Sequence, residues 1–556
     1  MATIRMKNRE SRMSDHQKSQ PTGPMQNRAA KEDLTGRDRL VSNVIFSWAT
    51  HFVFIVAGFI MPRMIDRRLG QELLGIWDFA WSLTIYMNFL SVGLSSSVAR
   101  YVSRFKSLEN WEELNVIVNS SLVLLIVSFC ACLGLAIGLA QLTPYILQIN
   151  DESQVSQAQL VLLILGTACA VQLLALAFKS VITGSGRFDI ESAIRGGSRV
   201  CEVATMIFIL VKGYGLIGLA VVVLSFECLR LLGSVVGSKY VCPQLRISFR
   251  RCSLAPLSQL LKFGGKSFLY MISRMGMYQF NAILIAHFLG PGMLAVFARQ
   301  RSLVLHCESI MIHYARALVP VASAIHAKND REGVRDIFIK GSLYNFYIVL
   351  PLMIVLTVMG GPLVRLWMGT TYESPVVLAI LAAGHLLVFS QRGTLSVITA
   401  LDRHGLAGIG MLVTLVVSVL LGSFLLGSME MGLTGAAVAL AFPVTFFAGV
   451  GTMLVGCRIT RISVRKYLRR TLIGPAKLMI PFAAWLVLAR WVCGKNASVA
   501  LIAGLMPGTI MLLGIYWYFV LPRSLKDRIT DSLVGLFRKI TCSSALRGEF
   551  DVRNSS

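Results

Sequence analysis

Long apolar blocks recur along this chain, and each is close to the length that a helix needs to cross a lipid bilayer. A helix rises about 1.5 Å per residue, so about 20 apolar residues span the roughly 30 Å of hydrocarbon. Hydrophobic residues make up 55% of the sequence and charged residues only 15%, whereas soluble domains average about 25% charged residues. These features predict an all-α integral membrane protein.

The apolar blocks predict about 14 transmembrane helices. They lie near residues 41–62, 76–98, 116–142, 158–183, 192–211, 214–240, 259–288, 293–318, 339–360, 374–400, 405–427, 431–457, 472–493 and 497–521. We expect residues 1–40 to be a disordered basic tail, since they are polar and contain no apolar core. Residues 522–556 are predicted to form a second tail.

Basic residues gather in alternate connections between these blocks, and the intervening connections have few. One set includes Arg100 and Arg104, then Lys179, Arg187, Arg195 and Arg199, then residues 241–258, 328–340 and 458–471. By the positive-inside rule this set is cytoplasmic, which puts both termini in the cytoplasm of a multi-pass plasma (inner) membrane protein. The net charge of +26 follows from this distribution, and we expect no nucleic-acid partner because no nucleic-acid-binding motif is present.

The chain contains an internal repeat that recurs after six predicted spans. Ser180 to Thr183 recurs at Ser396 to Thr399, and Gly215 to Ala220 recurs as a similar motif from Gly432. Because six is even, the two halves should have the same orientation in the membrane, an arrangement in which transporters often bind substrate between the halves. We expect a first lobe over 41–240 and a second over 259–457, joined by the linker 241–258. The linker 458–471 then leads to helices 13 and 14 over 472–521.

Several short motifs resemble one transporter family. They are Arg68-Leu69-Gly70 with Leu74 to Trp77, Val98 to Tyr101, Gly184 to Asp189 and the repeated glycine motif. In order and spacing, residues 40–520 resemble the polysaccharide (O-antigen type) flippases of the multidrug/oligosaccharidyl-lipid/polysaccharide exporter superfamily. This resemblance implies two six-helix lobes in a V plus two C-terminal helices, and transport by alternating access.

The same resemblance implies a substrate and partners. The substrate would be a polyprenyl-diphosphate-linked oligosaccharide, moved from the inner to the outer leaflet for the biosynthesis and export of a polysaccharide such as O-antigen or exopolysaccharide. Membrane lipid would be a further partner, and a polysaccharide polymerase and a chain-length regulator would be others.

Polar residues inside the predicted eighth span lie on one face of a helix. They are Arg299, Ser302, His306, Ser309, His313 and Arg316, with Arg301 and Glu308 on an adjoining strip. Polar residues within a membrane usually face the bundle interior or a water-filled cavity. Two interpretations remain: a hydrogen-bonded seam between helices, or the wall of a cavity.

The predicted seventh span has a weaker polar face that includes Ser267, Tyr270, Arg274, Tyr278 and Asn281. A buried Arg274 needs an anion, either a carboxylate such as Glu308, Asp78 or Glu227 or the substrate diphosphate. Arginine suits phosphate because its planar fork donates two parallel hydrogen bonds. The predicted substrate-binding residues are therefore Arg274, Arg299, Arg301, Tyr278, Asn281, His306 and Ser302.

The first lobe lacks equivalents of these arginines, because Phe54 aligns with Arg274 and Phe79 with Arg299 through the repeat. We therefore expect the anion site on the second lobe. Residues that could couple transport to an ion or proton are Asp78, Glu308, His313 and His51, with hydrogen-bonded packing as the alternative role for the histidines. Arg230 and Glu227 are predicted to form an internal ion pair. Two positions remain open for Arg63, Asp66, Arg67 and Arg68: lining the outer mouth, or lying among the lipid headgroups, which we favour.

No catalytic motif is found, so we expect no enzyme activity and no cofactor or metal. There is no phosphate-binding GxxxxGK[ST] sequence and no HExxH. Two alternative functions were considered. A multidrug or small-molecule antiporter of the same superfamily would need an acidic, aromatic cavity. A membrane polymerase or ligase acting on lipid-linked sugars would need a large catalytic loop, and the predicted connections are short.

Overall fold

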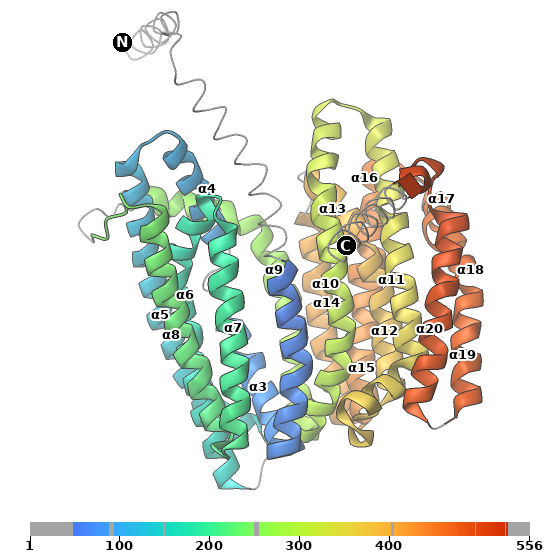
Figure 1. Ribbon diagram of the computed structural model, residues 1–556, viewed down its shortest axis with the longest axis horizontal. Helices are drawn as coiled ribbons and strands as arrows, with labels where there is room; N and C mark the ends of the chain where they lie inside the picture. The colour runs from blue at the N-terminus through green and yellow to red at the C-terminus, as the bar shows by residue number, and fades with distance from the viewer. Residues whose placement is uncertain are drawn as a thin grey trace, which may run out of the picture.

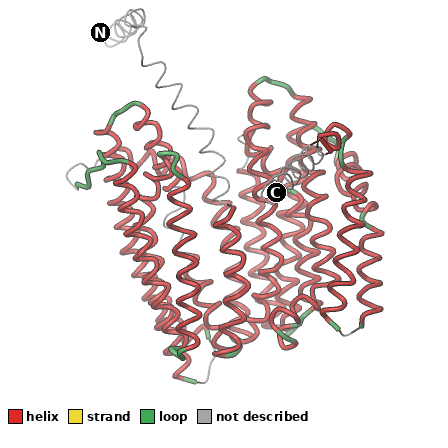
Figure 2. The backbone as a smooth tube through the Cα atoms, viewed as in Figure 1, coloured by secondary structure: helices red, strands yellow, loops and turns green. Residues whose placement is uncertain are grey.

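The structure is a computed structural model that describes residues 48–87, 94–147, 151–248, 255–401, 405–494, 496–528 and 530–531. Within these ranges the side chains of residues 94, 96, 255–268, 313 and 316 are left undescribed. The predicted tail over 1–40 lies outside the described residues, as do most of residues 522–556. The described chain folds into helices joined by short connections, without β-strands (Figure 2).

The first lobe contains the helices that precede residue 242. They are the Trp48–Leu69 helix, α3 (Gln71–Met87), α4 (Leu94–Ser107), α5 (Trp111–Ile146), α6 (Glu152–Gly184), α7 (Phe188–Val211) and α8 (Gly215–Val241). The long helices α5 and α6 pack along each other, and α6 also packs against α8.

The second lobe contains the helices that follow. The C-terminal helical segments Val464–Cys493 and Ala497–Val520 lie at its side (Figure 1). The lobe contains α9 (Ala255–Leu289), α10 (Pro291–Ala327), α11 (Arg331–Met368), η3 (Thr370–Tyr372), α12 (Pro375–Ser390), α13 (Arg392–Ala400), α14 (Gly405–Ser423), η4 (Phe424–Ser428), α15 (Gly432–Pro443), η5 (Val444–Val450) and α16 (Gly451–Thr460). The C-terminal segments contain α17 (Val464–Tyr467), η6 (Leu468–Ile473), α18 (Gly474–Leu478) and α19 (Ile480–Cys493), then α20 (Ala497–Ile515) and η7 (Tyr516–Val520).

In the described residues, 11 helices are long and apolar enough to cross a membrane, so the protein is a multi-pass membrane protein. The other three predicted spans, 76–98, 192–211 and 259–288, coincide with α3 and α4, with α7 and with α9. The described residues of these segments are helical, but α7 and α9 carry several charged residues. The count of about 14 spans therefore stays a prediction.

The two lobes form a V (Figure 1). They lean apart at the end that carries the connections 108–110, 185–187 and 328–330, which we call the open end. They converge at the opposite end, the closed end, where the connections 212–214 and 429–431 lie. At the closed end α3 of the first lobe packs against α10 of the second.

Glycine makes the contact at the closed end possible. A Cβ atom on Gly75 would lie 1.8 Å from the carbonyl oxygen of Pro291, so no other residue fits without moving the helices apart. Next to it, Gln71 Nε2 donates to the Gly292 carbonyl oxygen over 2.9 Å, and the Gly292 amide donates to Glu72 Oε2 over 3.0 Å. The closed end is therefore held by close backbone approach and by hydrogen bonds between the lobes.

The repeat found in the sequence is visible in the backbone. Gly70 and Gly290, at equivalent positions before α3 and α10, have φ angles of +92° and +84°. Gly215 and Gly432, at the start of α8 and α15, have φ angles of +68° and +57°. This left-handed region favours glycine, which explains why the repeated motifs retain it.

Candidate functional site

An ion pair joins the two lobes between α3 and α10. Arg299 Nη2 donates to Asp78 Oδ1 and Oδ2 over 2.5 and 2.6 Å. Arg299 is only 5% exposed, and its Nε and Nη1 are buried without a hydrogen-bond partner. Leaving buried donors unsatisfied is costly, so this guanidinium retains capacity to bind a further acceptor.

A second carboxylate, Glu308 on α10, bridges two arginines. It accepts from Arg274 Nη2 of α9 over 2.7 Å and from Arg392 Nη2 of α13. Arg392 Nη1 also donates to the Tyr270 hydroxyl over 2.9 Å. Glu308 is 2% exposed, so its carboxylate is shielded from water, while the Arg274 side chain is 29% exposed.

Arg392 was not identified from the sequence. It lies within the predicted tenth span, at the junction of α12 and α13, and an arginine in the middle of an apolar block was the signal that could have found it.

Arg301 of α10 has a backbone partner. Its Nη1 donates to the carbonyl oxygen of Tyr278 on α9 over 2.8 Å. The Tyr278 hydroxyl lies 3.2 Å from Nε2 of His385, which is also buried. Asn281 donates to the Ala436 carbonyl oxygen over 3.4 Å, while its own Oδ1 is buried without a partner.

These residues form one group, which we call the central cluster: Arg274, Arg299, Arg301, Arg392, Asp78 and Glu308. It contains four guanidinium groups and two carboxylates, an excess of two positive charges. Of the carboxylates considered as partners of Arg274, Glu308 is the one that pairs with it, while Glu227 lies in the first lobe.

The other predicted residues have local contacts. The Ser302 hydroxyl donates to the Arg299 carbonyl oxygen of its own helix over 2.9 Å. The His306 ring stacks on Phe59 with centroids 5.1 Å apart, and His51 meets Trp48 edge to face. The side chains of His313, Arg316 and Ser267 lie outside the described ones. Whether any of these residues binds substrate or couples an ion stays a prediction.

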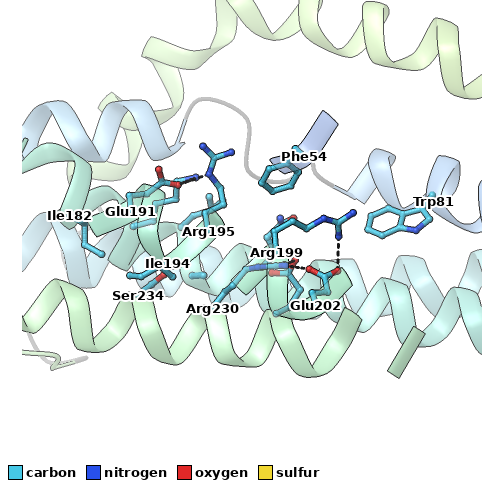
Figure 3. Close-up of a pocket in the computed structure, with 15 residues that line it drawn as sticks. Phe54, Trp81, Ile182, Glu191, Ile194, Arg195, Arg199, Glu202, Arg230 and Ser234 are labelled. Atoms are coloured by element: carbon cyan, nitrogen blue, oxygen red, sulfur yellow. Dashed lines mark hydrogen bonds and ion pairs between the residues drawn. The ribbon is translucent and has the colours of Figure 1, made fainter. Parts of the chain in front are cut away.

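The first lobe contains a pocket of about 610 Å³ (Figure 3). It lies among the Trp48–Leu69 helix, α3, α6, α7 and α8, and we call it the first-lobe pocket. Its walls include the rings of Phe54 and Trp81 and the apolar side chains of Leu176 and Ile194. The guanidinium groups of Arg195 and Arg199 each lie 5.4 Å from the centre of the Phe54 ring.

Ion pairs run along this pocket. Glu202 accepts from Arg199 Nη1 over 2.7 Å and from Arg230 Nη2, and Arg230 also pairs with Glu227 as predicted. Nearer the open end, Glu191 pairs with Lys179 over 3.0 Å and with Arg195 over 3.1 Å.

One assignment made from the sequence needs correction here. Arg195 and Arg199 were placed in a cytoplasmic connection, but α7 already begins at Phe188 and carries both into the pocket. The first lobe therefore has a basic group of its own, at positions that are unrelated to Arg274 and Arg299 by the repeat. The aligned Phe54 does lack a charge, yet it forms the surface over which Arg195 and Arg199 lie.

Arg63 and Asp66 connect the lobes near the closed end. Arg63 Nη1 donates to the Leu366 carbonyl oxygen over 3.0 Å, and Asp66 accepts from the Tyr372 hydroxyl. Trp367 Nε1 donates to the Phe59 carbonyl oxygen over 2.8 Å. Arg63 and Asp66 thus contact the second lobe, and the prediction of a position among the headgroups did not include this contact.

Known proteins match this chain in sequence. A family described as polysaccharide biosynthesis protein matches residues 118–377. A Shigella flexneri protein named as an O-antigen transporter is 24% identical over 329 residues, which cover 58% of this chain and 77% of that protein. The membrane protein EpsK of Bacillus subtilis, described as uncharacterized, is 22% identical over 436 residues, which cover 77% of this chain and 84% of that protein.

In sequence, the chain is therefore similar to polysaccharide biosynthesis proteins and to a protein named as an O-antigen transporter.

Solved structures confirm the fold of this chain. The lipid II flippase MurJ in an inward closed conformation aligns with a TM-score of 0.65 at 14% identity, covering 86% of this chain and 98% of that one. An inward-facing multidrug resistance MATE family transporter of the MOP superfamily aligns with a TM-score of 0.63 at 16% identity, covering 75% of this chain and 94% of that one. The two-lobed V predicted from the resemblance is confirmed.

Proposed function

We propose that this protein moves a polyprenyl-diphosphate-linked oligosaccharide from the inner to the outer leaflet of the plasma (inner) membrane. It acts as a transporter and not as an enzyme. Both termini and the open end face the cytoplasm, so the V shown in Figure 1 is ready to receive substrate from the inner leaflet. A polymerase and a chain-length regulator would use the glycan after it is delivered.

The observation that carries this proposal is the charge of the central cluster. Its excess of two guanidinium groups lies where α3 of one lobe meets α9 and α10 of the other. A diphosphate diester carries two negative charges, and arginine forks bind phosphate oxygens in pairs. The substrate diphosphate therefore matches the cluster in charge and in hydrogen-bonding capacity.

The same pairing suggests how substrate could start the transition between states. The free Nε and Nη1 of Arg299 offer the first donors to the diphosphate, and Arg301 can exchange its backbone acceptor for a phosphate oxygen. Sharing Arg299 with the substrate weakens its bond to Asp78, which joins the lobes. A ligand shifts a conformational equilibrium only through such differential contacts. The closed end could then separate while the open end closes.

The proposal is tested by replacing both Arg274 and Arg299 with Ala and measuring polysaccharide export in cells that lack their own transporter. We expect export to fall at least about a hundredfold, because two charged donors to the substrate are lost. Arg469→Ala is the matched control, since Arg469 is exposed on η6 and lies outside the central cluster. Undiminished export from a stably inserted double variant would show that these residues are not the substrate site.

A further inference from the structure

The first-lobe pocket has the size and the walls of a site for a small polar molecule. Its volume of about 610 Å³ falls within the roughly 300–1,000 Å³ of ordinary ligand sites. Trp81 is 37% exposed and presents part of its ring there. An aromatic face covers the apolar C–H face of a sugar ring well, while charged and amide side chains around it can bond the hydroxyl groups.

The charges of the pocket favour an anionic ligand. Four cationic side chains and three carboxylates line the pocket, which leaves an excess of one positive charge. The cations are Lys179, Arg195, Arg199 and Arg230, and the carboxylates are Glu191, Glu202 and Glu227. Nε of Arg195 lies 3.1 Å from Glu191 Oε1, whereas Nε of Arg199 is buried without a hydrogen-bond partner. Because unsatisfied buried donors are costly, a ligand acceptor placed there would be favoured.

Exposure decides which of these groups a ligand meets. The side chains of Lys179 and Arg195, toward the open end, are 38% and 40% exposed. Those of Glu202 and Glu227, deeper in the pocket, are only 1% and 10% exposed and are covered by Arg199 and Arg230. Figure 3 shows this order, with Glu191 and Ile182 at one end and Trp81 at the other. An entering molecule therefore meets cations first.

The Trp48–Leu69 helix connects this pocket to the central cluster's helix α10. Phe54 of this helix lines the pocket. Gly58 and Phe59, less than two turns farther along the same helix, lie beside His306 of α10. A glycan attached to a diphosphate in the central cluster would extend beside this helix. This continuity favours a sugar of the transported substrate over an unrelated anion.

We infer that the first-lobe pocket binds an acidic sugar of the transported glycan, with the sugar carboxylate on Arg195 and Arg199 and the ring against Trp81. This inference rests on the proposed flippase function and narrows its substrate to glycans that contain a uronic or similar acidic residue.

The test uses the full-length protein in lipid nanodiscs, with trigalacturonic acid as the acidic probe and its fully methyl-esterified form as the neutral one. Saturation-transfer-difference NMR gives the affinity and the sugar protons that touch the protein. We expect trigalacturonate to bind at least about tenfold more tightly than the ester, because its carboxylates gain charge-assisted hydrogen bonds. Equal affinity for the two probes would overturn the inference.

Matched variants locate the binding. The double variant Arg195→Gln with Arg199→Gln should weaken trigalacturonate binding about tenfold or more, and Trp81→Leu should weaken both probes. Arg469→Gln and Trp491→Leu are the controls; Trp491 lies on α19 and is 80% exposed. Unchanged affinity in both pocket variants would overturn the inference, because the sugar would then bind elsewhere.

Undecaprenyl diphosphate, which has no sugar, separates this inference from the proposed function. The pocket double variant should bind it as the unmodified protein does. If the unmodified protein binds undecaprenyl diphosphate yet does not prefer trigalacturonate, the acidic-sugar inference fails and the flippase proposal stands. If trigalacturonate is preferred and undecaprenyl diphosphate does not bind, the pocket is supported while the central cluster loses its proposed ligand.

Discussion

The central cluster and the ion pairs along the first-lobe pocket, which we call the first-lobe network, contain the same kinds of side chain. They differ in which parts of the molecule they connect. In the central cluster Asp78 belongs to the first lobe and Arg299 to the second. In the first-lobe network Glu191, Glu202 and Glu227 pair only with residues of α6, α7 and α8. One network therefore crosses the plane along which the lobes separate, and the other does not.

This difference suggests different roles during transport. When two lobes rock as rigid bodies, contacts within a lobe persist and contacts between lobes must be exchanged. The first-lobe network can carry a bound sugar unchanged from one side of the membrane to the other. The central cluster must find new partners, and an excess of guanidinium groups over carboxylates leaves room for substrate to supply them.

The largest effect is expected from Glu308→Gln. Removing this buried carboxylate leaves the guanidinium groups of Arg274 and Arg392, whose side chains are 29% and 11% exposed, without their shared partner, and breaking a buried ion pair costs up to about 3–5 kcal/mol of stability. Thermal unfolding in detergent measures the loss. Asp336→Asn is the control, because Asp336 pairs with Lys340 where both side chains are 59% exposed, and it should change little. A stability of Glu308→Gln equal to that of the control would contradict the bridging role.

Asp78→Asn tests the crossing between lobes. We expect it to cost about 3 kcal/mol, toward the lower end for a broken buried pair, and to lengthen the distance between spin labels on Tyr214 and Met429. These exposed positions lie at the closed end of the first and second lobes. Glu202→Gln should also destabilise the protein but leave that distance unchanged. If the two variants had the same effect on the distance, the contrast between the networks would be lost.

Gly75→Ala probes the closed end without changing a charge. Its Cβ would lie 1.8 Å from the Pro291 carbonyl oxygen, and such overpacking costs about 1–3 kcal/mol. We expect the same pair of labels to move apart. Gly134→Ala is the control, since nothing lies within 4 Å of its Cβ. A distance that stays short would mean that the helices absorb the clash locally.

The smallest effect is expected from Asp189→Asn at the open end. Asp189, in the first turn of α7, pairs with Arg187, which directly precedes the helix, and solvent-exposed pairs contribute only about 0–1 kcal/mol. Hydrogen bonding from Arg187 lowers the pKa of Asp189. The pair's contribution is therefore present at neutral pH and is lost as the pH falls through that lowered pKa. Unfolding measured at pH 7 and at pH 3 should show a larger difference between the variant and the unmodified protein at pH 7 than at pH 3.

The sequence predicted the parts of this structure that depend on local patterns. Apolar block length located the helices, and the repeated motifs that begin at Gly215 and Gly432 marked equivalent helix starts. The sequence left the anion beside Arg274 open between a carboxylate and the substrate diphosphate and did not predict the pairing of Asp78 with Arg299, because the partner of a buried arginine depends on which helices meet. Arg195 and Arg199 were misplaced because α7 carries enough charge to resemble a connection. The first-lobe pocket depends on the packing of five helices, which no local pattern contains.

The central claim is that two unneutralised guanidinium groups between the lobes bind the substrate's diphosphate. Its most direct measurement compares the affinity of the purified protein for undecaprenyl diphosphate and for undecaprenyl monophosphate, with and without Arg274→Gln and Arg299→Gln. The unmodified protein should prefer the diphosphate at least about tenfold, and the double variant should lose that preference. Equal affinities in the unmodified protein, or a preference that survives in the variant, would contradict the claim.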